Sequence, residues 1–530
     1  MTALRSAIAL AIPWLVLGLR TNPADLARFP EPAFPLEICV IALLATLLPL
    51  RAYSLFRAVA AVVLAAILFL KLADLGTGAA FQRPFNPYVD VKIMIDGWNL
   101  LSGSVGRAEA AAYIGAGIAL WLALVAIFVW SLGGFRRLRR PAARGVAAIA
   151  AAVLLACVAA PAIGYERIPI SAKAAPYLAD RIALIRHSVA DLAAFEAELG
   201  TDPIADIPEP RLFSVLAGTD VAVIFVESYG RSAIESPAYA RPVAGRLREV
   251  ERGIAAAGLQ VRSGWLTSPT VGGLSWLAHG TLLSGLWTDS QARYDRMITS
   301  ERRTINRLFR QAGWRTTAIM PAITMEWPEG AYFGYDTVRG ADGLGYEGKP
   351  FNWVTMPDQY TLSAFETLER HPGHTPVMAE IALISSHAPW TPIPTLIDWE
   401  ELDDGRIFDA QAEAGDPPSV VWAEPDSIRR HYLASIEYVL QTLGSYVARY
   451  GENTLFVVLG DHQPAAVITG ESGSRDVPVH MIGDPAMIAR IADWGWTEGM
   501  TPALDLPPVR MDGFRERFIR AFSAPRRENS

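Results

Sequence analysis

The sequence contains very little cysteine. Its two cysteines, Cys39 and Cys157, both lie inside apolar runs in the N-terminal part of the 530-residue chain. The remainder of the chain has no thiol, which excludes disulfide bonds, thiolate metal ligands and cysteine nucleophiles there. The shortage does not identify a compartment, because a domain without cysteine is compatible with either side of a membrane.

The chain also has no excess of positive charge. Its 54 acidic and 47 basic side chains give a formal net charge of −7, so we expect no nucleic-acid partner. Hydrophobic residues, by contrast, make up 51% of the chain, and the mean hydropathy is +0.23. That is too apolar for an ordinary soluble protein of this length, and nearly all of the excess lies before about Tyr165.

Five apolar stretches approach the length of about 20 residues that a helix needs to cross a bilayer. They are Leu4–Leu19, Phe34–Leu50, Ala58–Leu75, Ala110–Leu132 and Gly145–Ile163. The first could instead be a signal peptide, although no small-residue cleavage site follows it. The sequence therefore predicts an N-terminal bundle of five transmembrane helices over residues 1–164.

Positive charges in the short loops predict the orientation of this bundle. The loop Gly133–Arg144 carries five arginines and no acid, which predicts a cytoplasmic position. Arg5, Arg51 and Arg57 are expected on the same side. Five crossings then place the rest of the chain outside the cytoplasm. We expect a multi-pass protein of the inner (plasma) membrane with its C-terminal domain on the periplasmic or extracytoplasmic side.

Residues 165–212 are predicted to connect the membrane part to the C-terminal domain, through a helix over Ala174–Leu199 and a proline-containing linker over Asp202–Pro210. Residues 213–530 alternate apolar strands with amphipathic helices, which indicates an α/β domain. The predicted strands are Val221–Val226, Thr316–Met320, Val377–Ile384, Thr454–Leu459 and Val477–Ile482. The predicted helices are Pro242–Ala257, Trp276–Leu283, Glu301–Ala312 and Ser427–Tyr450.

Two polar residues in the first part of this domain are candidates for chemistry. Glu227 follows an apolar strand, where a carboxylate often holds a metal ion; the alternative is a helix-capping or salt-bridged acid. Ser275 follows two glycines and a leucine and precedes a predicted helix. A helix N-terminus favours an alkoxide and an anionic substrate through its dipole and free N–H groups. The alternative is that Ser275 is merely the helix N-cap.

Two later strands end in segments that contain histidine. Gly460, Asp461 and His462 follow one of them, and the glycine permits a sharp turn. Adjacent carboxylate and imidazole ligands suit Mn²⁺, Zn²⁺ or Mg²⁺. His387 follows the other strand. A lone histidine is more often structural than catalytic, so His387 is a candidate only in the company of the other residues.

The candidates occur in one order: a strand with Glu227, a glycine-rich loop with Ser275, a strand with His387, and a strand with Asp461 and His462. In that order they resemble the alkaline phosphatase/sulfatase superfamily. With five spans ahead of them, they are similar to membrane phosphoglycerol transferases of the lipoteichoic acid synthase type. The resemblance covers nearly the whole chain in architecture but only short motifs in identity.

The resemblance implies an N-terminal membrane bundle followed by an α/β alkaline phosphatase-like (sulfatase-like) domain. It implies that one divalent metal ion, Mn²⁺ or Zn²⁺ with Mg²⁺ as the alternative, is bound by Glu227, Ser275, Asp461 and His462. Ser275 stands in the nucleophile position, which the family usually fills with threonine.

The headgroup pocket departs from the family in one residue. The resemblance implies that His387 and Trp327 line this pocket, and residues 333–336 match the family pattern. Phosphoglycerol-type members carry an arginine two residues beyond the pocket tryptophan, where this chain has Glu329. An acid would repel phosphate and could bind an ammonium group instead, while Arg231 could supply the missing positive charge.

The resemblance implies metal-dependent transfer of a phospholipid headgroup phosphate, of the phosphoglycerol or phosphoethanolamine type, to a glycan or lipid acceptor through a phospho-Ser275 intermediate. One alternative is a membrane-bound phosphodiesterase or sulfatase-type hydrolase. The C/S-x-P-x-R motif of sulfatases is absent near Ser275, and the lack of cysteine differs from the disulfide-rich phosphoethanolamine transferases. The other alternative is a catalytically inactive membrane scaffold. The sequence gives no oligomeric state.

Overall fold

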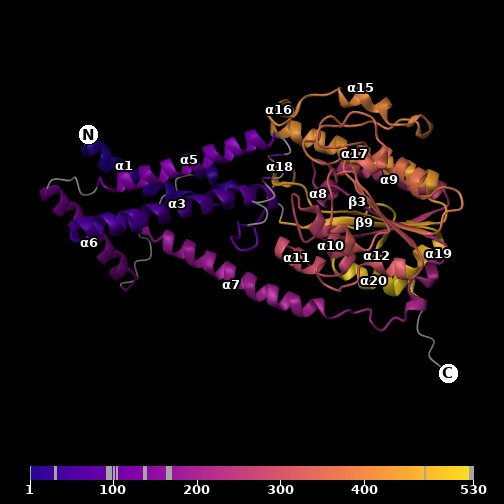
Figure 1. Cartoon of the computed structure of the whole chain (residues 1–530), viewed down its shortest axis with the longest axis horizontal. Coiled ribbons are helices and arrows are strands. Elements are labelled where there is room, and N and C mark those ends of the chain that lie inside the picture. Colours follow the sequence, from indigo (N-terminus) through magenta and orange to yellow (C-terminus); the bar gives the residue numbers. More distant parts are fainter. Residues whose placement is uncertain are drawn as a thin grey trace. The chain divides into compact units, whose positions relative to one another are not determined.

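The computed structural model describes residues 2–28, 33–90, 98, 102, 106–134, 140–162, 170–470 and 473–523 (Figure 1). The chain forms two compact units, Met1–Asp191 and Leu192–Ser530. The division falls inside helix α7 (Ala174–Leu199), whose bounds agree with the predicted connecting helix.

The first unit is helical, and each of the five predicted spans overlaps one of its helices. They are α1 (Thr2–Gly18), α2 (Leu36–Leu47), α3 (Leu50–Phe81), α5 (Arg107–Leu132) and α6 (Arg140–Ala162). Within the described residues, α3 and α5 are long and apolar enough to cross a membrane. The 12 residues of α2 span only about 18 Å, too short for a hydrocarbon core of about 30 Å. Five transmembrane helices are therefore not confirmed.

The second predicted span is broken near its end by a proline. Leu48 is extended, with φ −76° and ψ 143°, as expected for a residue that precedes proline. Pro49 then takes the N-cap position of α3, which begins at Leu50; proline is tolerated there because its missing N–H has no helical partner. The result is one short helix and one of 32 residues in place of two of similar length.

Two arginines that were used to predict the orientation of the bundle lie on a helix. Arg51 and Arg57, which the sequence places in a loop between spans, lie in the first turns of α3. The basic segment with Arg136, Arg137 and Arg139 lies outside the described residues.

The second unit is built on a nine-stranded sheet with the order β10-β4-β9-β8-β3-β7-β5-β6 and β11 paired with β4. The strands from β8 to β6 are parallel to one another, and β9 runs antiparallel to both β8 and β4. The bounds are β3 Asp220–Val226, β4 Gln260–Thr267, β5 Arg315–Ile319, β6 Thr337–Arg339, β7 Val377–Leu383, β8 Thr454–Gly460, β9 Asp476–Gly483, β10 Thr497–Glu498 and β11 Val509–Arg510.

Each predicted strand lies on an observed strand whose ends differ by at most one residue. The prediction missed β4, where Arg262, Ser263 and Gly264 interrupt the apolar pattern. It also began one helix too early. Helix α12 (Ile305–Gln311) starts after Thr304, whose hydroxyl accepts a hydrogen bond from the Arg307 N–H at 3.1 Å and caps the helix.

Helices cover both faces of this sheet, because its central strands are apolar on both sides. Along β3, alternate side chains enter two separate cores. Ala222 and Ile224 belong to one core, and Val223 and Phe225 belong to the other. Figure 1 shows one helix layer on each side of β3 and β9. Residues of α9 (Ala240–Ala256), α14 (Asp358–Glu369) and α17 (Pro425–Tyr450) belong to the core on one face. Residues of α10 (Ser275–Ser284), α11 (Gln291–Ile298), α12 and α20 (Gly513–Phe522) belong to the core on the other face.

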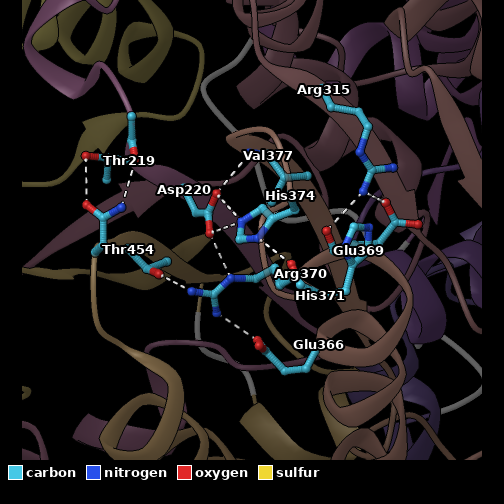
Figure 2. Close-up of polar contacts among 12 residues, drawn as sticks. Thr219, Asp220, Arg315, Glu366, Glu369, Arg370, His371, His374, Val377 and Thr454 are labelled. Atoms are coloured by element: carbon cyan, nitrogen blue, oxygen red, sulfur yellow. Dashed lines mark hydrogen bonds and ion pairs between the residues drawn. The ribbon is translucent and has the colours of Figure 1, made fainter.

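A buried carboxylate joins the three central strands where they begin (Figure 2). Asp220 accepts hydrogen bonds from the Val377 N–H and the Arg370 Nε, both at 2.9 Å. Arg370 also donates to the Thr454 hydroxyl at 2.7 Å, and His374 Nε2 lies 2.9 Å from the Asp220 carboxylate. Since these residues begin β3, β7 and β8 or lie near them, the contacts align the strands, and their carboxyl ends emerge side by side at the opposite edge of the sheet.

His480 on β9 is a buried histidine outside that network, and its neutral form is fully bonded. The Ser263 hydroxyl donates to the Gly499 carbonyl at 2.6 Å, so the His480 Nδ1–H donates to that hydroxyl at 2.7 Å, and Nε2 accepts from the Tyr229 hydroxyl at 3.3 Å. Burial lowers the pKa of His480 to about 3.

We expect the free energy of unfolding to fall as the pH decreases from 6.5 towards 3, because the unfolded chain binds a proton at His480 that the folded chain excludes. His480 should lower the free energy of unfolding by about 1.4 kcal/mol for each pH unit of this decrease. His480→Gln should flatten this slope, while His371→Gln, at an exposed histidine, should not. Unfolding of the full chain followed by near-ultraviolet circular dichroism measures the slope. Equal slopes in wild type and His480→Gln would contradict the prediction.

Candidate active site

The loop before Ser275 is shaped by three successive residues with positive φ. They are Gly272 (73°), Gly273 (146°) and Leu274 (64°). Glycine adopts these values without steric cost, whereas Leu274 is held in the left-handed region at some strain. Helix α10 then begins at Ser275, and Leu274 occupies the N-cap position. The interpretation of Ser275 as an N-cap is therefore wrong, and its hydroxyl is available for other contacts.

The Ser275 hydroxyl lies among the residues that follow β3 and β8. It donates to Glu227 Oε2 at 3.1 Å and lies 3.3 Å from His462 Nε2. Glu227 and Asp461 come together because the parallel register pairs the last residues of the two strands. The Ser228 N–H then donates to Asp461 Oδ1 at 2.8 Å and joins the two strand ends. The structure brings Glu227, Ser275, Asp461 and His462 to one point.

Gly460 is required by close packing rather than by a turn. A Cβ atom at this position would lie 1.8 Å from the Tyr229 carbonyl oxygen. The backbone after β3 thus crosses directly over the end of β8, and any larger residue at position 460 would separate the two strand ends. The predicted sharp turn at Gly460 is wrong, since this residue is the last of strand β8.

The donor atoms at this point fit a divalent cation. Among the described residues, Glu227, Asp461 and His462 form a group whose ligand atoms all lie within 4.8 Å of one another. His462 Nε2 is 3.4 Å from Glu227 Oε1 and 3.5 Å from Asp461 Oδ2. A tetrahedral ion with bonds of about 2.0–2.1 Å needs donor separations of about 3.3 Å. His462 Nδ1 contacts the Gln463 carbonyl at 2.9 Å, so Nε2 is the nitrogen left for a metal.

Burial and mutual charge perturb the pKa values in this cluster. Burial, reinforced by the negative charge of Glu227, raises the pKa of Asp461 to about 6. Burial opposes the charged form of His462, but the Asp461 and Glu227 carboxylates outweigh it and raise the pKa of His462 to about 9. Burial likewise opposes ionisation of Glu227, yet the His462 charge keeps the pKa of Glu227 below its usual range. The two carboxylates thus favour a positive charge beside them, which a metal ion would supply.

A cavity of about 330 Å³ opens beside Ser275. Most of its walls are apolar and aromatic. Trp327 and His387 line it, together with Phe225, Glu227, Ser275, Trp276, His279, Tyr294, Met320, Ala322, Ile323, Phe333, Trp353, Val354, Glu380, Ala382, Leu383, Ile384 and Asp461. No lysine or arginine is found among these described lining residues.

Two predicted substrate-binding residues do not line this cavity. Arg231 bonds elsewhere, to Glu235 at 2.6 Å, Asp476 at 3.1 Å and the Leu504 carbonyl at 2.6 Å. Glu329 precedes the short helix α13 (Gly330–Phe333) and is not a lining residue either. Neither residue is among those that line the cavity, and their roles toward an amine (Glu329) and a phosphate (Arg231) stay predictions.

Two lining residues, His279 and Glu380, were missed by the sequence analysis. His279 lies one helical turn after Ser275 on α10, and Glu380 interrupts the apolar strand β7. The sequence could have indicated both residues. His279 is four residues after Ser275 and so shares its helix face, and Glu380 is an acid within a buried strand, which rarely occurs without a partner.

A hydroxyl, two carboxylates and an imidazole at the carboxyl edge of a parallel sheet define a candidate metal-dependent esterase or transferase site. The chain belongs to the sulfatase family, whose model matches residues 219–495. The predicted resemblance to the alkaline phosphatase/sulfatase superfamily is thereby confirmed. No curated protein sequence matches the chain.

Solved structures similar to this chain include lipoteichoic acid synthase LtaP from Listeria monocytogenes, with 12% identity over 55% of this chain and 70% of that one and a TM-score of 0.36. Phosphoglycerol transferase GacH from Streptococcus pyogenes has 13% identity over 56% of this chain and 74% of that one, with a TM-score of 0.37. The soluble domain of lipooligosaccharide phosphoethanolamine transferase A from Neisseria meningitidis has 11% identity over 57% of this chain and 88% of that one, with a TM-score of 0.37.

Proposed function

We propose that the protein transfers the headgroup phosphate of a membrane phospholipid to a glycan or lipid hydroxyl, with Ser275 as the nucleophile. The observation that carries this proposal is the position of the Ser275 hydroxyl, 3.1 Å from Glu227 and 3.3 Å from His462 at the start of α10. A phosphoryl group beside Ser275 would also meet the free N–H groups of that helix N-terminus.

The reaction has two displacement steps. In its deprotonated form, Ser275 Oγ attacks the phosphorus of the donor, and the bond from phosphorus to the diacylglycerol oxygen breaks; the second step releases the same deprotonated oxygen. The hydroxyl of the acceptor then attacks the same phosphorus, and the bond to Ser275 Oγ breaks. A divalent cation held by Glu227, Asp461 and His462 would lower the pKa of the Ser275 hydroxyl and offset charge on the phosphoryl oxygens.

A lipid donor is supported by the first unit of the chain. In the apolar window of α5, 6% of the residues are buried within the protein, and in that of α3, 28%. Apolar helices with so little internal burial fit a membrane environment better than the core of a soluble protein. A catalytic domain attached to a bilayer works at a high effective concentration of lipid donor. The position of the catalytic domain outside the cytoplasm remains part of the proposal.

The cavity supports the proposal that a lipid headgroup is the group transferred with the phosphate. Trp327 and His387 lie on its walls, and the cavity volume of about 330 Å³ suits a small polar group bound beside Ser275. The presence of Glu227, Asp461 and His462 together argues against an inactive scaffold, because a degenerate catalytic domain is expected to have lost a ligand.

The test is lipid mass spectrometry on vesicles. Purified full chain with Mn²⁺ or Zn²⁺ is added to vesicles that contain phosphatidylglycerol and phosphatidylethanolamine, with and without a glycan acceptor. We expect diacylglycerol to accumulate together with one modified acceptor. Release of free headgroup phosphate without a modified acceptor would indicate a hydrolase. No diacylglycerol under any condition would contradict the proposal.

A further inference from the structure

A histidine and a buried glutamate form a pair in the wall of the cavity. His279 Nδ1 lies 2.7 Å from Glu380 Oε1, and the side chains are 14% and 1% exposed. Both residues line the cavity that contains Ser275. They come from different elements, α10 and β7, and neither belongs to the metal-binding group.

The contacts of this pair fix the orientation of the imidazole. The second Glu380 oxygen accepts a hydrogen bond from the Tyr335 hydroxyl, so both carboxylate oxygens are occupied. The His279 ring stacks on Phe225, with centroids 3.7 Å apart and planes 13° apart. With Nδ1 bonded to Glu380 and one ring face covered by Phe225, Nε2 is the nitrogen left to meet a ligand in the cavity.

His279 is also close to the nucleophile in the fold. It follows Ser275 by four residues on α10, and residues at this spacing share a helix face with Cβ atoms about 5–6 Å apart. A carboxylate that bonds Nδ1 of a histidine holds one tautomer and stabilises the charged imidazolium, which suits Nε2 for proton transfer.

The other histidine on the cavity wall lacks this arrangement. His387 Nδ1 lies 2.5 Å from the carbonyl oxygen of Ala388, and no carboxylate among the described residues is bonded to its ring. The paired histidine is therefore the better candidate for moving protons.

We propose that His279 is the general acid and base of the transfer reaction and that Glu380 is its positioning residue. The inference rests on the proposed function and deepens it. In the first step the His279 Nε2–H gives its proton to the diacylglycerol oxygen as the bond from phosphorus to that oxygen breaks. In the second step the acceptor hydroxyl gives its proton to Nε2 as its oxygen attacks the phosphorus. The leaving and attacking oxygens occupy the same position opposite Ser275, so one histidine serves both steps and ends the cycle protonated as it began.

The dependence of rate on the leaving group tests this role. A leaving group of low pKa departs without a proton, whereas one of high pKa needs the acid. The probes are the p-nitrophenyl and phenyl esters of phosphoglycerol and of phosphoethanolamine, and the measured quantity is the single-turnover release of the phenol. We expect His279→Gln to slow release from the phenyl ester by about 10²–10³-fold and from the p-nitrophenyl ester by less than about tenfold.

Glu380→Gln provides a second, isosteric variant. The introduced amide can still accept a hydrogen bond from Nδ1 but carries no charge, so the same selective loss is expected at a smaller size, and the double variant should be no slower than His279→Gln alone. This non-additivity would not follow if Glu380 only stabilised the fold. The Glu380→Gln variant by itself keeps the test decisive if His279→Gln does not fold. The thermal unfolding midpoint of each variant is measured alongside.

The chain offers a matched control at the far edge of the sheet. His374 also pairs with a buried carboxylate, Asp220, at 2.9 Å (Figure 2), but it does not line the cavity. His374→Gln should leave the leaving-group dependence unchanged. An equal loss on both esters in a folded His279→Gln variant, or no loss, would overturn the acid–base role. Phenol release by a Ser275→Ala variant would instead overturn the proposed function, so the two failures are distinguishable.

Discussion

Ser275→Ala is expected to lower the rate of headgroup transfer by at least about 10³-fold, because the variant has no atom that can form the bond to phosphorus. The measurement is diacylglycerol release from the donor vesicles, together with a search for phosphate on the intact protein by mass spectrometry. The wild type should carry the headgroup phosphate, as a diester, on Ser275 when the acceptor is withheld, and the variant should carry none.

The loss should not come from unfolding. Leu274 is the N-cap of α10, so alanine at position 275 removes hydrogen bonds of the Ser275 hydroxyl but no helix cap. We expect the free energy of unfolding to change by no more than about 1 kcal/mol. Ser284→Ala, at the other end of α10, removes a buried hydroxyl with a 2.6 Å bond and should keep full activity. Ser275→Thr should retain measurable activity. Activity of Ser275→Ala within tenfold of wild type would show that another group is the nucleophile.

Removal of the divalent cation is expected to have an effect of similar size. Two carboxylates and one imidazole nitrogen converge within 4.8 Å, and without a cation the Ser275 hydroxyl would remain protonated near neutral pH. Treatment with a chelator should therefore lower transfer by at least about 10³-fold, and added Mn²⁺ or Zn²⁺ should restore it. Mg²⁺ should restore less, since a nitrogen ligand favours the softer ions.

Metal content separates this role from a general effect of the chelator. Asp461→Asn removes one charged ligand and should reduce bound metal from about one ion per chain to less than about a tenth of that at micromolar free metal. Glu249→Gln, at a glutamate on α9 paired with Arg246, should bind metal as the wild type does. Full activity of the chelated protein, with no metal detected, would contradict the prediction.

The strands and their polar ends were predictable because the signals are local. A run of apolar residues that ends in a carboxylate or in Gly-Asp-His predicts a buried strand and a polar strand end from a few adjacent residues. Glu227, Asp461 and His462 were identified in this way, and the register of β3 and β8 places them together. The number of membrane-crossing helices was less predictable, because Pro49 divides an apolar stretch that hydropathy alone treats as continuous.

The composition of the cavity was decided by the tertiary structure. Glu329 is close in sequence to Trp327, yet it does not line the cavity, and Arg231 follows Glu227 by four residues but bonds to Asp476 and Glu235. Proximity along the chain is a poor guide here, because successive side chains after a strand or a turn point in different directions.

By itself, the sequence determined the α/β domain and its central strands and made Glu227, Ser275, Asp461 and His462 candidates, since each of these depends on a pattern within one element. The family resemblance then implied that the four residues act as one set. Only the tertiary structure showed that His279 pairs with Glu380 and that the Tyr229 backbone leaves no room for a side chain at Gly460. Those contacts join segments about 100 and about 230 residues apart, and their distances depend on how α10 packs on the sheet and how closely the backbone after β3 approaches β8. Such distances follow from side-chain volumes summed over both cores, which no local pattern contains.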